Sequence, residues 1–180
     1  MKPVFRSIDE VIALGALALG TAALWARPRG TMPAVAITAG VGLLGLVLPV
    51  PLRRQPRASM SQWMLVAALG VAAFLAARLA VLLIPVPVSG AAIVAGLVAA
   101  VGEEAFFRRL LYGWLERWGT AAAIAGSAAL FAAIHFPSYG LGAMPIDFAA
   151  GLLFGWQRWA SGTWSAPAVT HAAANLLQLG

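Results

Sequence analysis

Long apolar stretches, separated by short polar or proline-containing breaks, make up almost the whole chain. Several of these stretches approach the roughly 20 residues that an α-helix needs to cross a hydrocarbon core of about 30 Å. The pattern predicts seven spans, at about residues 11–26, 33–52, 62–84, 89–117, 120–136, 145–160 and 164–179. Because backbone amides and carbonyls in lipid must be satisfied within their own segment, we expect an all-α, polytopic transmembrane helical bundle.

The predicted spans end at arginine, glycine and proline residues. The first ends at Arg27-Pro28-Arg29-Gly30, the third at Pro85-Val86-Pro87, and the fifth at Pro137-Ser138-Tyr139-Gly140. Proline lacks the amide hydrogen that a helix interior requires, so a proline after an apolar run indicates where that helix stops.

The composition agrees with a membrane protein and narrows its chemistry. Hydrophobic residues make up 62% of the chain and charged residues 10%. The net charge of +6 does not indicate nucleic-acid binding, because the arginines lie in short loops, where positive charge sets topology. The chain has no cysteine, which excludes a thiol nucleophile, a cysteine-ligated zinc site and disulfide bonds.

The distribution of lysine and arginine predicts a cytoplasmic N-terminus. With that orientation only Arg27 and Arg29 lie on the opposite side of the membrane. The cytoplasmic side then carries Lys2, Arg6, Arg53, Arg54, Arg57, Arg117 and Arg158. We expect an integral protein of the bacterial inner (plasma) membrane, in contact with the lipid bilayer.

One glycine motif imitates a dinucleotide-binding fingerprint. Gly40-Val-Gly-Leu-Leu-Gly45 fits G-x-G-x-x-G, but it follows no strand and no acidic residue lies about twenty positions further on. Small residues in an apolar helix allow a neighbouring helix to approach closely. We therefore interpret the motif as a helix-packing surface.

Two adjacent carboxylates interrupt the fourth predicted span, followed by two adjacent arginines. One charge at the centre of a span costs about 2.5–3.5 kcal/mol on insertion scales. Glu104 and Arg108 are four residues apart and share a helix face, so we expect them to form an ion pair. Glu103 is turned about 100° away, and we expect it to lack this partner and to be suited to proton transfer. The alternative is an ion-pair network that only fixes helix packing.

Both histidines lie in later spans, where polar groups tend to face one another. His135 ends the fifth span, and His171 in the seventh is followed four residues on by Asn175, on the same helix face. We expect these three side chains and the two glutamates to share a cavity. A carboxylate and an imidazole can deprotonate water, and a second imidazole and an amide can stabilise an oxyanion, so the set favours hydrolysis. A proton-coupled transporter and a non-catalytic membrane scaffold are the alternatives.

Three other polar residues receive simpler interpretations. Asp147 follows Pro145 at a predicted helix start, where an acid complements the helix dipole. Arg78 lies within the third span and is expected to snorkel or to pair with a glutamate. Arg109 lies on a different face from Arg108, and we expect it to contact a lipid phosphate.

The polar residues form three motifs, Glu103-Glu104-x-x-x-Arg108, Phe131-x-x-x-His135 and His171-x-x-x-Asn175. Their order and spacing resemble the motifs of the CAAX-protease and bacteriocin-processing (CPBP, Abi) family, which are intramembrane glutamate-type endopeptidases. The resemblance covers about residues 89–179. We therefore divide the chain into N-terminal transmembrane helices without a recognised motif, residues 1–88, and a CPBP-like catalytic core, residues 89–180.

The resemblance implies a catalytic site of six residues: Glu103, Glu104, Arg108, His135, His171 and Asn175. Glu103 and His135 would activate the water, His171 and Asn175 would stabilise the oxyanion, and the other two would support the site. We expect no cofactor. The alternative is zinc or another divalent metal held by Glu103, His135 and His171, a permissible set of three ligands. The implied partner is a membrane-associated protein or peptide, cut at a prenylated C-terminus, a leader peptide or a C-terminal sorting signal.

Overall fold

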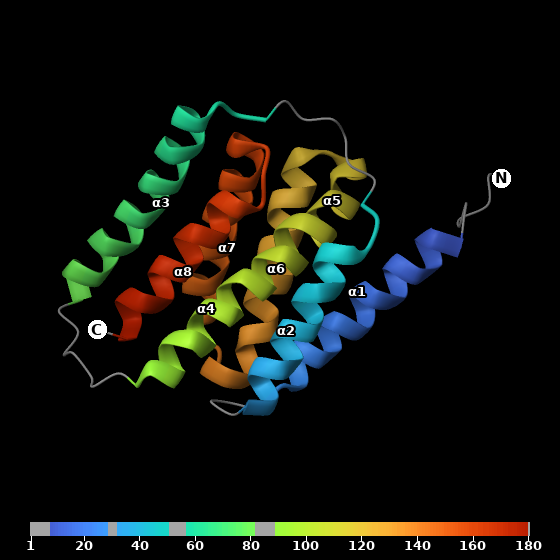
Figure 1. Ribbon diagram of the computed structural model, residues 1–180, viewed down its shortest axis with the longest axis horizontal. Coiled ribbons are helices and arrows are strands. Elements are labelled where there is room, and N and C mark those ends of the chain that lie inside the picture. Colours follow the sequence, from blue (N-terminus) through green and yellow to red (C-terminus); the bar gives the residue numbers. More distant parts are fainter. Residues whose placement is uncertain (1–7, 29–31, 51–56, 82–88, 180) are drawn as a thin grey trace.

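The computed structural model describes residues 8–28, 32–50, 57–81 and 89–179, and all regular structure within these ranges is helical. Seven helical segments form one bundle (Figure 1). They are α1 (Ile8–Ala26), α2 (Met32–Val47), α3 (Met60–Val81), the continuous helix from Gly90 to Trp118, α6 (Thr120–Tyr139), α7 (Met144–Ser161) and α8 (Ser165–Leu179). The all-α prediction is confirmed.

Three of the described helices are long and apolar enough to cross a membrane: Met60–Ala80, Gly90–Trp118 and Thr120–Tyr139. The helices α1 and α2 are apolar but shorter, and α7 and α8 carry polar residues on faces that the bundle buries. The prediction of about seven spans is therefore met only in part. Five of the basic residues used to predict the orientation lie outside the described residues, namely Lys2, Arg6, Arg29, Arg53 and Arg54. The segment 82–88, which ends at the proposed boundary, also lies outside them.

The continuous helix from Gly90 to Trp118 lies between helices from both halves of the chain (Figure 1). Its first part, α4 (Gly90–Glu104), packs on α2 and on α8. Further contacts join α3 to α8, α1 to α6, and α6 to α7. Within the described residues, the N-terminal helices therefore pack directly on the helices that carry the charged motifs.

A π-helical segment, η1 (Ala105–Leu111), follows Glu104 directly. Such segments occur frequently at functional sites. It buries Phe106, Phe107 and Leu110 in the hydrophobic core and also buries Arg108. The sequence predicted a regular helix here, and its periodicity carried no signal for the wider turn. Beyond η1 the chain continues through α5 (Tyr112–Leu115) and the short turn η2 (Glu116–Trp118).

Only Gly119 separates this long helix from α6. Its φ of +103° lies in the left-handed region, which glycine adopts readily because it has no Cβ. Glu103 and His135 lie equally many residues before and after Gly119. The helical hairpin brings these two side chains together, with Oε2 of Glu103 3.7 Å from Nε2 of His135.

The helix α6 ends later than predicted. It continues through Pro137 to Tyr139 and ends at Gly140, whose φ is +76°. Proline removes only its own amide hydrogen bond, and in the last turn of a helix this loss does not stop the helix. His135 therefore lies inside α6, about one turn before its end, and not at the end as the sequence indicated.

Two arginines bind backbone carbonyl groups of neighbouring helices. Arg109 donates to the carbonyl oxygens of Gly45 and Leu48 at the end of α2, the second at 3.1 Å. Arg78 donates through Nε to the carbonyl oxygen of Leu177, near the end of α8, at 3.0 Å. Both cations satisfy carbonyl groups near helix C-termini, where positive charge is favourable. The sequence did not indicate these contacts, and the lipid phosphate expected for Arg109 stays a prediction.

The glycine motif of α2 faces the long helix. A Cβ at Gly42 would lie 2.5 Å from the Cα of Gly102, and one at Gly45 would lie 2.5 Å from the carbonyl carbon of Ala105. At Gly40, in contrast, nothing lies within 4 Å of the added atom. The interpretation of the motif as a helix-packing surface is confirmed.

We expect Gly42→Ala to destabilise the fold by about 1–3 kcal/mol, because the contacting atoms belong to the backbone and cannot turn aside. Gly40→Ala is the matched control, since alanine gains the same helix propensity of about 1 kcal/mol at either position. Reversible unfolding in mixed detergent micelles measures both free energies. Equal unfolding free energies for the two variants would contradict the close approach of α2 and α4.

Candidate active site

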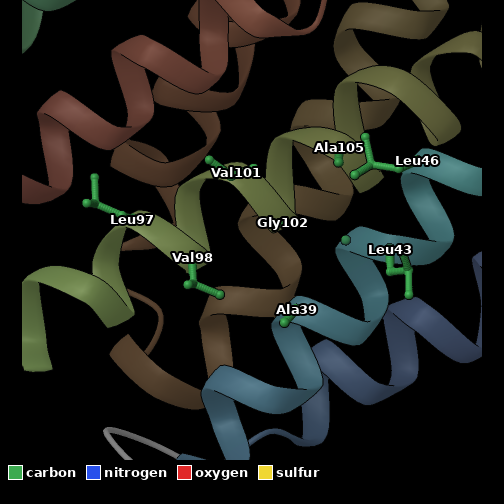
Figure 2. A pocket seen from close by; sticks show the side chains of 9 residues that line it. Ala39, Leu43, Leu46, Leu97, Val98, Val101, Gly102 and Ala105 are labelled. Carbon is green, nitrogen blue, oxygen red and sulfur yellow. The ribbon is translucent and has the colours of Figure 1, made fainter.

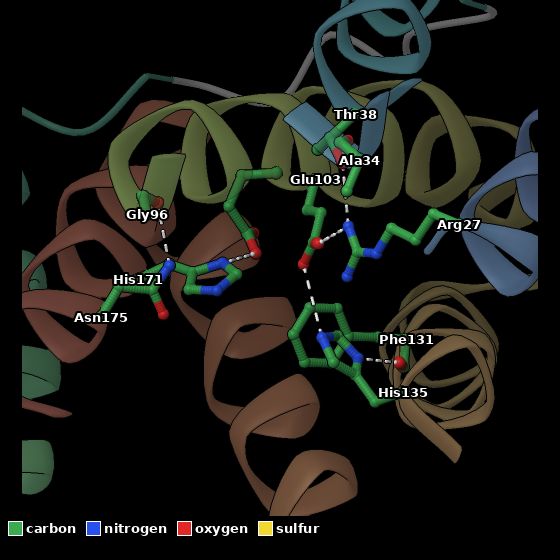
Figure 3. A network of polar contacts seen from close by, with 10 residues as sticks. Arg27, Ala34, Thr38, Gly96, Glu103, Phe131, His135, His171 and Asn175 are labelled. Carbon is green, nitrogen blue, oxygen red and sulfur yellow. Dashed lines mark hydrogen bonds and ion pairs between the residues drawn. The ribbon is translucent and has the colours of Figure 1, made fainter. Parts of the chain in front are cut away.

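Glu103 lies buried between an arginine and a histidine (Figure 3). Its Oε1 is 2.5 Å from Nη1 of Arg27, and its Oε2 is 3.7 Å from Nε2 of His135. The expectation that Glu103 has no charged partner is therefore wrong. Arg27 follows α1 directly, and no sequence pattern connects two residues 76 positions apart.

Glu104 is held in the same way by a second pair. Its Oε2 lies 3.3 Å from Nε of Arg108, the partner that the four-residue spacing predicted. Its Oε1 accepts a hydrogen bond from Nδ1 of His171 at 3.0 Å, a contact that the sequence did not suggest. Each glutamate thus contacts one arginine and one histidine, so the structure contains two separate Arg–Glu–His contact networks.

Arg108 is fully buried, and aromatic rings surround its guanidinium. The guanidinium carbon lies 4.7 Å from the ring centre of Phe131 and 5.3 Å from that of Phe154, within the range of cation–π attraction. Its Nη2 also donates to the carbonyl oxygen of Gly151 in α7 at 3.1 Å. Arg108 therefore joins α4, α6 and α7 around one charge.

The backbone of α6 determines the tautomer of His135. Nδ1 lies 2.7 Å from the carbonyl oxygen of Phe131, four residues earlier, and only a protonated nitrogen can donate to a carbonyl. In the neutral ring Nε2 is then an acceptor, and so is the facing Oε2 of Glu103. A single water molecule can donate one hydrogen to each of these two acceptors. The spacing Phe131-x-x-x-His135 thus leaves Nε2 of the neutral ring as an acceptor.

A cavity of about 250 Å³ adjoins both histidines. His135, His171 and Asn175 form part of its wall, together with Phe131 and Phe154. Nδ2 of Asn175 donates one hydrogen bond to the carbonyl oxygen of Gly96 at 2.9 Å, which leaves its second amide hydrogen. Glu103 does not itself line this cavity, but it contacts His135, which does.

Asp147 also lines the cavity, although the sequence suggested only a helix-start role. It does lie in the first turn of α7, as expected. Its Oδ2 is buried and has no hydrogen-bond partner among the described residues. Because a buried acceptor without a partner is unfavourable, this oxygen is a natural position for a hydrogen-bond donor of a bound molecule.

The alternative metal site does not fit this geometry. Among the described residues, no group of three or more His, Asp or Glu side chains is arranged to hold a metal ion, and this includes the set Glu103, His135 and His171. The guanidinium of Arg27 already contacts Glu103, and its positive charge would repel a divalent cation.

A second recess lies between α2 and α4 and has a volume of about 410 Å³ (Figure 2). Its lining includes Gly102 and Ala105, on either side of the two glutamates, but every side chain in it is apolar. It offers no group that could take up or donate a proton. The polar cavity beside the histidines is therefore the candidate active site.

Comparison with known proteins gives one match. Residues 85–177, just over half of the chain, match the family model described as "Type II CAAX prenyl endopeptidase Rce1-like". No curated protein and no solved structure matches the chain. The matched region contains both glutamates, both histidines, Arg108 and Asn175, whereas Arg27 lies outside it.

Proposed function

Since the chain belongs to the Rce1-like family of type II CAAX prenyl endopeptidases, it is a membrane-embedded hydrolase, and we propose that it cuts a peptide bond with water activated by Glu103 and His135. One observation carries this mechanism. Oε2 of Glu103 and Nε2 of His135 face each other at 3.7 Å, and His135 borders the cavity.

In this mechanism the water donates one hydrogen to Oε2 of Glu103 and the other to Nε2 of His135. As its oxygen attacks the carbonyl carbon, one proton moves to Nε2, and the Glu103 carboxylate stabilises the resulting imidazolium. His135 then gives that proton to the amide nitrogen of the leaving peptide. The carbon–nitrogen bond breaks, and the other fragment leaves as a carboxylic acid.

His171 and Asn175 supply the hydrogen-bond donors that stabilise the developing oxyanion. Glu104 accepts from Nδ1 of His171 and stabilises positive charge on that ring, whose Nε2–H then donates to the developing oxyanion. The second amide hydrogen of Asn175 donates to the same oxygen. Arg108 balances the charge of Glu104, so the bundle does not hold an uncompensated carboxylate at this depth.

The substrate is a membrane-associated protein or peptide, and three classes are open: prenylated C-termini, leader peptides, and C-terminal sorting signals of surface proteins. We place the protein in the bacterial inner membrane with a cytoplasmic N-terminus. Comparing the protein termini of membranes with and without the active protein would identify the class that is cut.

Reconstitution in proteoliposomes tests the proposed function directly. The full chain is incubated with two probes, a peptide with a farnesylated cysteine near its C-terminus and an unmodified leader-type peptide with an apolar segment. We expect mass spectrometry to detect cleavage of at least one probe at a single bond. Proton flux across the liposome membrane without cleavage of either probe would instead support a transporter.

A further inference from the structure

We infer that Arg27 is a positioning residue for Glu103, so that the N-terminal helices complete the active site. This inference rests on the proposed function, because it concerns the carboxylate assigned to water activation. Arg27 does not line the cavity, and its hydrogen bonds go to Glu103 and Thr38, so we infer that it acts on the site through Glu103.

The position of the Arg27 guanidinium is determined by α2. Nη1 of Arg27 donates to Oγ1 of Thr38 at 3.0 Å and to Oε1 of Glu103 at 2.5 Å. Thr38 gives its own hydroxyl hydrogen to the carbonyl oxygen of Ala34, at 2.9 Å, so its oxygen faces Arg27 as an acceptor. Thr38 is buried, and α2 thus aims the guanidinium at Glu103 (Figure 3).

Arg27 affects both the charge and the direction of the carboxylate. Glu103 is 2% exposed, and an isolated ionised carboxylate at such a position would be strongly disfavoured. The guanidinium compensates that charge. It also occupies Oε1, so that Oε2 is the oxygen that faces His135. A Glu103 protonated at Oε2 would present a hydroxyl donor towards His135, and a rotated Glu103 would turn Oε2 away from it, so neither would offer the water an anionic acceptor there.

The arrangement of Arg108, Glu104 and His171 supports this role. Glu104 lies between Arg108 and His171, as Glu103 lies between Arg27 and His135, although the distances and the histidine nitrogens differ. Arg108 belongs to the region that matches the family model, whereas Arg27 and Thr38 precede it. One of the two cations of the site therefore comes from helices that contain no catalytic motif.

The test compares Arg27→Met and Arg27→Lys with Arg117→Met in proteoliposomes, using whichever peptide probe the unaltered protein cleaves. Arg117 is the matched control, because it pairs with Glu10 of α1 at 3.6 Å and so also ties α1 to the bundle, away from the cavity. We expect Arg27→Met to lower kcat about 100-fold with KM changed less than about twofold, as for a misplaced catalytic group. Arg27→Lys should recover about tenfold of that loss, because it restores the charge without the planar fork. Arg117→Met should keep both constants within about twofold.

Unchanged kcat in folded Arg27→Met would overturn the inference and leave the proposed function intact. The same conclusion would follow if the cleavage rate of the variant fell only in proportion to the amount of folded protein. Retained cleavage by Glu103→Gln would overturn the proposed function instead, so the two failures are distinguishable. If Arg27→Met does not fold, Thr38→Val answers the same question, since it removes only the hydroxyl that aims Arg27. We expect it to lower kcat about fivefold at unchanged KM, and an unaltered kcat would contradict the positioning role.

Discussion

We expect Glu103→Gln to lower kcat for peptide cleavage by about 1000-fold or more, within the range that general acid–base groups contribute. Glutamine has nearly the same size, and its oxygen can still accept from Arg27. Its amide nitrogen, however, is a donor and cannot accept a hydrogen from the water that faces His135. The variant should also lose the negative charge that stabilises the imidazolium during attack.

The measurement is the rate of probe cleavage by equal amounts of folded protein in proteoliposomes. Glu10→Gln is the control, because Glu10 is an acid of α1 that pairs with Arg117 and lies outside the cavity wall. It should cleave the probe at the rate of the unaltered protein. Cleavage by Glu103→Gln at a similar rate would remove Glu103 from its proposed role.

We expect Arg108→Met to lower the free energy of unfolding by about 3–5 kcal/mol, because it leaves the buried carboxylate of Glu104 without its cation. The substitution also removes the hydrogen bond to the Gly151 carbonyl and the contacts with the rings of Phe131 and Phe154. The helices α4, α6 and α7 meet at this guanidinium, so its loss should weaken their packing.

Unfolding in mixed micelles measures this effect, and a double variant separates charge from packing. In Glu104→Gln/Arg108→Met the uncompensated carboxylate is absent, so the double variant should be more stable than Arg108→Met alone. Equal stability of Arg108→Met and the unaltered protein would show that the pair does not hold the bundle together. Neither variant is expected to cleave the peptide probes. In Arg108→Met, Glu104 loses its cation, and in the double variant His171 also loses the negative charge of Glu104.

Local features of the fold could be predicted from the sequence because they depend on residues one helical turn apart. The contact between Glu104 and Arg108 is of this kind. The glycine face of α2 was also predictable, since a run of small residues in an apolar helix has few other uses.

Contacts between distant helices could not be predicted in this way. Arg27 appeared to be a loop arginine that sets topology, and its contact with Glu103 depends on how α1 and α2 lie against α4. The hydrogen bond from His171 to Glu104 depends in the same way on the packing of α8. Three of the described helices are long and apolar enough to cross a membrane, and the other predicted spans stay predictions, because apolar composition marks helices buried in a bundle as well as helices that cross lipid.

The single-residue turn at Gly119 also limits how the length of this chain can vary. One residue inserted into either arm, between Gly119 and Glu103 or between Gly119 and His135, would move that side chain by about 1.5 Å and rotate it by about 100° around its helix. The inserted arm would then present a neighbouring residue to the water. Insertions and deletions in homologous chains are therefore expected in the connections outside this hairpin, or in both arms together.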